Sequence, residues 1–323
     1  MQNILQGAKN KEEQEVNEMK KLLLLANFHS GKGIIKSNLA DMIDYYNSRG
    51  FEVTVYTSQY SGHITDIVEK TGSLYDNIVC CGGDGTLNET VNGMMSLEKR
   101  PLLGYIPCGS TNDFANSIGI PVIVEDSYKT AVDGMPFTID IGSINGRHFS
   151  YVAGFGLFTS VSYETPQTIK NILGYQAYIL TGLKEITNIK TYPVKITYDG
   201  GVIEDEVMIG LVSNSNSIAG LKILFENYAD LNDGLFEVLL VKKPRNASLL
   251  KNIVNCLVEK KFDNDMFYSF KTNKLVIESR DYIKWTVDGE YSGDYDHAEI
   301  EVIPGAVDIL IDKRESEDKE GGK

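Results

Sequence analysis

A glycine-rich segment, Gly82-Gly83-Asp84-Gly85-Thr86, carries the clearest chemical pattern in the sequence. It follows an apolar run predicted to be a strand and precedes a segment predicted to be a helix. Glycines let a backbone approach a ligand closely, and the N–H groups at a helix start favour a phosphate. Asp84 would repel phosphate oxygens unless a cation such as Mg²⁺ lay between them. The pattern predicts a nucleoside triphosphate site with its metal, although the glycines alone would also suit a tight turn capped by Asp84.

Two other loops that contain glycine and hydroxyl residues also follow predicted strands. They are Asn27-Phe28-His29-Ser30-Gly31-Lys32-Gly33 and Pro107-Cys108-Gly109-Ser110-Thr111-Asn112. In an open parallel sheet, ligands bind beyond the carboxyl ends of the strands, so the three loops are expected to line one cleft. The first loop lacks the glycine and lysine spacing of a Walker-type phosphate loop, which argues against that class of ATPase.

A turn with two carboxylates, Asp288-Gly289-Glu290, ends an apolar strand late in the chain. Turns often carry acidic residues only because they are exposed. A phosphate site opposite the turn changes that interpretation, because phosphoryl transfer needs a carboxylate that orients or deprotonates the attacking hydroxyl. Asp84 would then serve the metal side and Glu290 the nucleophile side. The predicted catalytic residues are Asp84, Asp288 and Glu290.

The elements that must position these residues change in character along the chain. Between residues 20 and 140, strands and amphipathic helices alternate, which predicts an α/β domain with a parallel sheet and helices on both faces. Between residues 141 and 303, Asn145-Gly146 and Asp199-Gly200 separate alternating apolar segments, as β-hairpin turns do. This second domain is predicted to be mostly β, with one helix near residues 247–260. The last strand, residues 304–312, is compatible with either domain, including a return to the first.

The composition restricts both the class of protein and its location. The chain has 45 acidic and 31 basic side chains, a formal charge of -14 and the wrong sign for general nucleic-acid binding. No apolar stretch reaches the ~20 residues of a spanning helix and none suits a signal peptide, so a cytoplasmic protein is expected. The 4 cysteines lack disulfide or zinc spacing and are expected to be core thiols. Residues 1–19 and the tail at 313–323 are polar and are predicted to be flexible.

Taken together, these motifs resemble the diacylglycerol kinase-like lipid kinases, which are related to sphingosine kinases and, more distantly, to NAD kinases and phosphofructokinases. The resemblance extends from Lys20 to about Asp312. It rests on GGDGTLNETVNG at 82–93, PCGSTNDFA at 107–115, IDIGSING at 139–146, LNDGLFEV at 231–238 and VDGE at 287–290. It implies an ATP-binding α/β domain of the phosphofructokinase and NAD kinase type, joined to a C-terminal antiparallel β-sandwich. The active site is expected in the cleft between the two domains.

The same resemblance implies a role for each matching residue. Glu290 would be the base that accepts the proton of the lipid hydroxyl. A structural Mg²⁺ would lie near Asp233 and the backbone carbonyls of Asp230 and Leu235, linked through water to Asp140. Phe28 and Ser110 depart from the family pattern, which usually has proline and threonine there, and the serine keeps the hydroxyl. Nucleotide contacts would come from Asn27, Ser30, Gly31, Thr57, Gly82, Gly83, Asp84, Gly85, Thr86, Leu87, Asn88, Glu89 and Ser110.

The predicted function is an ATP- and Mg²⁺-dependent lipid kinase that transfers the γ-phosphoryl group to a lipid hydroxyl. Diacylglycerol, which gives phosphatidic acid, is the favoured acceptor, and the sequence leaves sphingoid bases, ceramide and isoprenoid alcohols open. An NAD kinase-like enzyme is one alternative, although those enzymes typically continue the second loop with Ala-Tyr where this chain has Asn112-Asp113-Phe114. A nucleotide-binding sensor that has lost catalysis is the other.

The expected partners follow from that function. A lipid substrate implies peripheral contact with the membrane, at its inner face for a cytoplasmic enzyme, and the overall negative charge opposes contact with an anionic leaflet. Residues 242–284 hold 10 basic and 5 acidic side chains, so the β-rich domain is expected to face the bilayer. No nucleic acid is expected as a partner, and a homodimer is left open.

Overall fold

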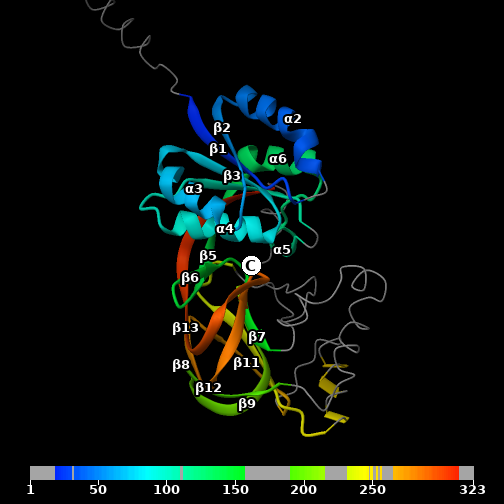
Figure 1. The fold of residues 1–323 in the computed structure, drawn as a ribbon, viewed down its shortest axis with the longest axis vertical. Coiled ribbons are helices and arrows are strands. Elements are labelled where there is room, and N and C mark those ends of the chain that lie inside the picture. The colour runs from blue at the N-terminus through cyan, green and yellow to red at the C-terminus, as the bar shows by residue number, and fades with distance from the viewer. Residues whose placement is uncertain are drawn as a thin grey trace, which may run out of the picture.

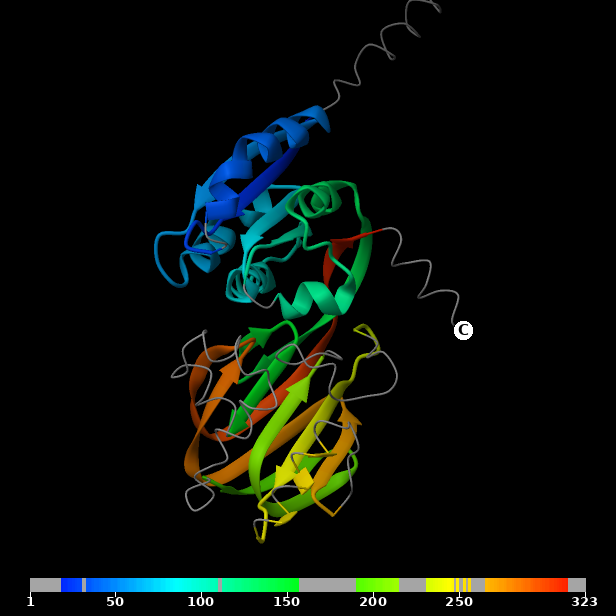
Figure 2. The same cartoon turned by 90° about the vertical axis from the view of Figure 1, so that its right-hand side faces the viewer.

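Two domains stacked end to end make up the structure, a computed structural model (Figure 1). It describes residues 19–30, 33–109, 112–156, 190–214, 231–246, 248–249, 252–253, 255–256 and 265–312. Two long strands, β5 (Met135–Ile144) and β13 (Glu290–Ile311), run from the helix-containing domain into the strand-rich one (Figure 2). The predicted division into an α/β part and a mostly β part is confirmed.

The first domain is built on a mostly parallel sheet. Four strands are each parallel to the next, in the order β2 (Phe51–Thr57), β1 (Lys20–Ala26), β3 (Asn77–Gly82), β4 (Leu102–Pro107). The C-terminal part of β13 then pairs with β4 in parallel, through Ile309 and Leu103, and β5 closes the sheet antiparallel to β13. The helices are α2 (Ile34–Ser48), α3 (His63–Thr71), α4 (Asp84–Met95), α5 (Asp113–Ile118) and α6 (Val124–Asp133), with a 3₁₀ turn η2 at Gly72–Leu74.

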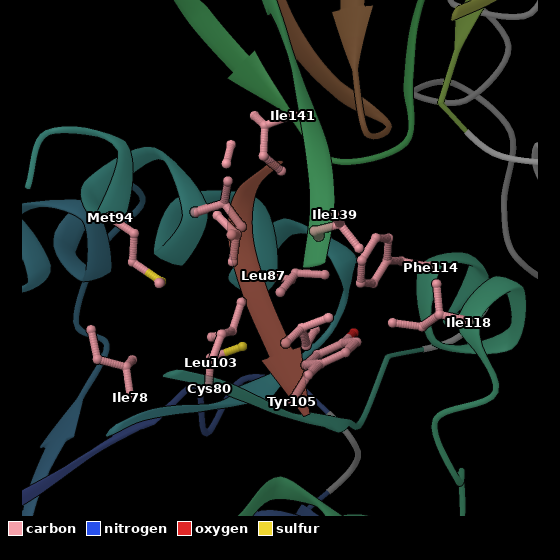
Figure 3. Close-up of a cluster of buried hydrophobic side chains, with 14 of the residues drawn as sticks. Ile78, Cys80, Leu87, Met94, Leu103, Tyr105, Phe114, Ile118, Ile139 and Ile141 are labelled. Atoms are coloured by element: carbon pink, nitrogen blue, oxygen red, sulfur yellow. The ribbon is translucent and has the colours of Figure 1, made fainter. Parts of the chain in front are cut away.

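Helices cover both faces of this sheet, which explains the unbroken leucine run in β1. Leu22 and Leu24 belong to the core under α2 and α6, whereas Leu23 and Leu25 belong to the core under α3, α4 and α5. Successive side chains of a strand alternate between faces, so a strand covered on both faces needs an apolar residue at each position. Figure 3 shows the second of these cores, with labelled side chains from three strands and two helices: Ile78, Cys80, Leu103, Tyr105, Ile139, Ile141, Leu87, Met94, Phe114 and Ile118.

Helix α6 was not expected from the sequence. Its buried side chains, Ser127, Tyr128 and Ala131, give a short stripe with little apolar character. Glu125 and Asp126 lie in its first turn, where negative charge is favourable at the positive end of the helix dipole. These two residues were the available signal for its start.

The second domain is a set of antiparallel strands packed around Trp285. This side chain is fully buried, and its ring centroid lies 4.8 Å from that of Phe155. The predicted hairpin turns Asn145-Gly146 and Asp199-Gly200 connect β5 to β6 and β8 to β9, and the helix predicted at 247–260 falls largely outside the described residues. The strands that join β5 and β13 here are β6 (Arg147–Phe149), β7 (Val152–Gly156), β8 (Tyr192–Tyr198), β9 (Gly201–Ser213), β10 (Phe236–Lys242), β11 (Phe267–Thr272) and β12 (Lys274–Val287).

Strands β5 and β13 pair with each other in both domains. Residues 300–303 of β13 pair with 141–144 of β5, and residues 307–311 pair with 135–139, with a register shift in between. At the shift, Gly305 takes a positive φ of 57° and donates its N–H to Asp140 Oδ1 at 2.7 Å. The predicted domain boundary between residues 140 and 141 therefore falls inside a continuous strand, and residues 306–311 complete the first sheet.

Among the residues that the structure describes, no helix has the length and apolar character needed to cross a bilayer.

The shared strand predicts that one side chain of β13 supports the first domain. Ile309 is fully buried between β4 and β5, so Ile309→Ala should lower the free energy of unfolding by about 2–5 kcal/mol. Val202→Ala, which truncates a side chain 57% exposed on β9, should change it by less than ~0.5 kcal/mol. Urea unfolding of both variants measures the difference. Equal stabilities would show that β13 is dispensable for the first sheet.

Candidate active site

Three loops meet at one edge of the parallel sheet, beyond the carboxyl ends of β1, β3 and β4. Asn27, directly after β1, donates its N–H to Cys81 O at 2.9 Å, and Cys108, directly after β4, donates to Gly82 O at 2.7 Å. The outer two loops are thus hydrogen-bonded to the central one. Parallel strands end at the same sheet edge, so segments far apart in the sequence come together there.

Glycines allow two of these loops to touch backbone to backbone. A methyl group on Gly83 would lie 3.2 Å from Cα of Gly109, and one on Gly109 would lie 2.8 Å from Cα of Gly83. A methyl group on Gly82 would lie 2.3 Å from Oγ1 of Thr86. Only a residue without Cβ fits such close approach. Peptide groups of the two loops are therefore in direct contact at this edge of the sheet.

Asn27 joins the first loop to the start of α4. Its Nδ2 donates to Oγ1 of Thr86 at 3.1 Å, and its Oδ1 accepts the N–H of His29 at 3.0 Å. Ser30 donates its N–H to Asn27 O at 3.1 Å, which closes the turn. The Oγ of Ser30 lies 4.0 Å from a methyl group placed on Gly83, so this hydroxyl borders the glycine loop. Gly31 and Ser110, both predicted nucleotide contacts, fall outside the described residues.

Asp84 is the first residue of α4, at the helix end that favours negative ligands. Its Oδ2 accepts a long hydrogen bond, 3.4 Å, from the N–H of Asp113. Burial raises the pKa of Tyr151 well above its ordinary value, and the charges of Asp288, Asp84, Asp113 and Glu290 raise it further. Carboxyl groups from both domains therefore share the region around Tyr151.

Glu290 reaches the first turn of α4 from the other domain. It opens β13 after the turn at Asp288-Gly289, and its side chain is exposed. A methyl group on Gly85 would lie 3.2 Å from Oε1 of Glu290. The carboxylate thus lies against the helix end at which a phosphate would be held.

Asp288 is turned into the protein and is only 4% exposed. Its carboxylate accepts N–H groups of Ser150 at 2.7 Å, Tyr151 at 3.0 Å and Val152 at 3.1 Å, and Nδ2 of Asn88 at 2.8 Å. Burial raises the pKa of Asp288 to about 6, although these hydrogen bonds act to lower it. Of the two carboxylates in this turn, Glu290 is the one available to a substrate.

Two other predicted nucleotide-binding residues direct their side chains elsewhere. Leu87 lies in the core beneath α4 (Figure 3), and Glu89 accepts the N–H groups of Gly62 at 2.8 Å and Ile64 at 3.2 Å, at the start of α3. Both residues keep only backbone atoms for contact with a nucleotide. Thr57, at the end of β2, accepts Nε2 of Gln59 through its carbonyl and hydroxyl oxygens.

The predicted structural metal site holds carboxylates that already have hydrogen-bond partners. Asp140 is buried and accepts the N–H groups of Gly234 at 2.8 Å and Gly305 at 2.7 Å. Asp233 accepts the N–H of Leu235 at 2.9 Å and pairs with Nζ of Lys271 at 3.1 Å. Asp230 falls outside the described residues. Within the described ranges, no three His, Cys, Asp or Glu side chains are arranged to hold a metal by themselves.

Asn92 was not expected as a site residue, and Asn88 was expected only as a nucleotide contact, yet both fasten α4 to the second domain. Asn92 donates Nδ2 to His148 O at 3.0 Å and accepts the N–H of His148 at 3.0 Å, and Asn88 donates to the same carbonyl at 3.1 Å. Asn88 and Asn92 lie four residues apart and so share a helix face. That spacing, in residues that are poor helix formers, was the available signal.

Comparison with known proteins gives matches over both domains. The model of the diacylglycerol kinase catalytic domain matches residues 21–144, and that of the YegS C-terminal NAD kinase beta sandwich-like domain matches residues 154–311. Curated diacylglycerol kinases of Bacillus subtilis (strain 168) and Staphylococcus saprophyticus are 34% and 33% identical over 279 and 277 residues, with 85% of this chain and 91% and 90% of theirs covered.

Solved structures give the same result. Two from Bacillus anthracis str. Sterne, one described as a candidate diacylglycerol kinase and one as a diacylglycerol kinase, have TM-scores of 0.78 and 0.71 at 28% and 25% identity. They cover 92% of this chain and 96% and 98% of their own. The resemblance drawn from the sequence motifs is confirmed, and the chain belongs to the diacylglycerol kinase family.

Proposed function

We propose that this protein is an ATP-dependent lipid kinase whose acceptor is diacylglycerol and whose product is phosphatidic acid. The observation that supports this best is the position of the Glu290 carboxylate against Gly85, at the N-terminus of α4. Phosphoryl transfer needs a held phosphate, an acceptor hydroxyl in line with it, and a carboxylate that orients the hydroxyl or takes its proton. The first domain supplies the phosphate site and the second supplies the carboxylate.

The phosphate groups of ATP bind to backbone N–H groups of the glycine loop and of the first turn of α4 in this proposal. Asp84 would be the residue that holds Mg²⁺, because Mg²⁺ sites in kinases commonly use only one or two carboxylates. When bound, Mg²⁺ neutralises the charge that develops on the transferred phosphoryl group. A second, structural Mg²⁺ near Asp233, Leu235, Asp230 and Asp140 stays a prediction, and it would have to compete with Lys271 for Asp233.

Glu290 acts on the acceptor. As the lipid hydroxyl oxygen attacks the γ-phosphorus, the bond between that phosphorus and the bridging oxygen breaks, and ADP leaves. The hydroxyl proton passes to the Glu290 carboxylate. Its exposed position lets it meet a hydroxyl that enters from outside the cleft. A nucleotide-binding sensor without catalysis would have no need of this carboxylate at the phosphate site.

Diacylglycerol is proposed as the acceptor because the curated relatives that match both domains are diacylglycerol kinases. The NAD kinase-like alternative is weaker. Its support is the description of the second domain as similar to an NAD kinase β-sandwich, which concerns architecture rather than substrate.

Contact with a membrane surface belongs to the same proposal, because the acceptor is a lipid. Several of the basic residues counted between 242 and 284 have acidic partners: Lys243 pairs with Glu206 at 2.8 Å, Lys271 with Glu237 at 2.9 Å, and Lys274 with Glu299. These pairs weaken the basic surface expected on the β-rich domain. Of the other basic residues counted, Lys242, Arg245, Arg280 and Lys284 are described, and Lys251, Lys260 and Lys261 lie outside the described residues.

Replacing the proposed base should stop turnover without unfolding the protein. Glu290→Gln keeps the size of the side chain but cannot accept the proton, so kcat should fall by about 100- to 10,000-fold. Glu299→Gln, an exposed glutamate on the same strand, should keep the wild-type rate, because its surface pair with Lys274 is screened by solvent and lies outside the proposed site. Initial rates of lipid phosphorylation and thermal melts test both variants. Full turnover in E290Q would remove the proposed base.

Removing the metal should abolish transfer, and adding Mg²⁺ back should restore it. Asp84→Asn should raise the Mg²⁺ concentration needed for half-maximal rate by about tenfold or more, since one charged contact is worth roughly 1.5–3 kcal/mol. Asp126→Asn, an exposed carboxylate of α6, is the matched control and should leave the requirement unchanged. Undiminished activity in excess EDTA would contradict the metal-dependent mechanism.

The acceptor is tested directly with labelled ATP and a panel of acceptors. Diacylglycerol, sphingosine, ceramide and NAD should be presented with detergent micelles and, for the lipids, in anionic vesicles. We expect label in phosphatidic acid, with vesicle binding that weakens as salt is raised. Label in NADP instead would favour the NAD kinase-like alternative, and vesicle binding indifferent to salt would argue against electrostatic membrane contact.

A further inference from the structure

We propose that Asn88 and Asp288 are positioning residues, and that the hydrogen bond between them sets the place of Glu290 over the first turn of α4. This inference rests on the proposed kinase function. The sequence predicted a nucleotide contact for Asn88 and a catalytic role for Asp288. Both side chains are only 4% exposed and they bind each other, at 2.8 Å from Nδ2 to Oδ2.

Asp288 has no acceptor capacity left for a substrate. An ionised carboxylate offers about four lone-pair positions. Three backbone N–H groups, from residues 150–152, and the Asn88 amide occupy its two oxygens. The N–H of Asp288 also donates to Val152 O at 2.8 Å. The turn that carries Glu290 is therefore fixed to segment 150–152 of its own domain.

Asn88 connects this fixed turn to the phosphate-binding helix. Its Nδ2 bonds both Asp288 and His148 O, so one amide from the first domain holds two segments of the second. Asn88 lies three residues after Gly85, about 4.5 Å along the helix axis. The route from Gly85 to Glu290 thus consists of one helical turn, one hydrogen bond and a two-residue step. Each of these has a fixed length, so together they set the separation of the phosphate site and the base.

Loss of this hydrogen bond should therefore affect chemistry more than nucleotide binding. Asn88→Ala removes the link and leaves the glycine loops intact. A misplacement of about 1 Å can lower a rate by about 100-fold. We expect kcat to fall by about 10- to 100-fold in N88A, while KM for ATP changes by less than about threefold.

Asn92→Ala is the matched control. Asn92 lies on the same helix face and bonds the backbone of His148. Its Nδ2 also donates to Oδ1 of Asn88 at 3.2 Å, but it does not bond Asp288. It should lower stability to a similar extent and keep kcat within about threefold of wild type, which separates positioning from simple docking of the domains. Equal kcat losses in the two variants, or a KM for ATP that rises in N88A as far as kcat falls, would overturn the inference.

Asn88→Asp gives a second readout and decides the matter if N88A does not fold. It places a carboxylate against that of Asp288, and two carboxylates in one site come to share a proton as pH falls. The ratio of kcat in N88D to kcat in wild type should rise by about tenfold between about pH 8 and pH 6. Tyr151, His148, Asp84, Asp113 and Glu290 are the other titratable groups around the turn, and they are present in both proteins. A flat ratio would contradict the proposal.

A measurement without turnover separates this inference from the proposed function. Amide hydrogen exchange at Gly289 and Glu290 should be faster in N88A than in N92A, whichever substrate the enzyme uses. A wild-type protein that phosphorylates no acceptor would defeat the proposed function alone. Equal exchange rates in N88A and N92A would defeat the positioning role alone.

Discussion

The arrangement of the site residues depends on the hydrogen bonds that the buried carboxylate of Asp288 needs. An ionised carboxylate removed from water is costly unless charges or hydrogen bonds replace the lost hydration. In this protein the replacement comes from residues 150–152 and from Asn88, a helix residue 200 positions away. Segments that satisfy one buried charge must lie close together. Their convergence gives Glu290, two residues further on, a defined place at the first turn of α4.

A second constraint acts on the domains as whole bodies. β5 and β13 pair with each other in the first domain and again in the second, so a strand ladder rather than a linker sets how the two domains are joined. The register of the β5–β13 pairing shifts between the two domains, and at this point Asp140 accepts the N–H groups of Gly305 and Gly234.

Local pattern was sufficient for most of the elements and for the three loops at the sheet edge. A few neighbouring residues were enough to predict the conformation of the leucine run of β1, of the glycines before α4 and of the Asn145-Gly146 turn. Burial on both faces, close backbone approach and positive φ each restrict the residue types at single positions. Helix α6 was missed because its buried stripe is short and polar residues interrupt it. The pairing of Asn92 with His148 was missed because side-chain hydrogen bonds between distant segments leave no period in a sequence.

The order of the motifs along the chain, from the glycine-rich loop with its aspartate to the distant acidic turn, was enough to predict the family. The direction of each side chain depends on the tertiary structure. Leu87 and Glu89 belong to the same motif as Asp84, yet one enters the core and the other binds the start of α3. Asp288 and Glu290 are equivalent as residue types in a turn. Asp288, with a backbone φ of 48°, points toward buried N–H donors. Glu290 lies instead beside Gly85 in the first turn of α4, a helix far away in the chain.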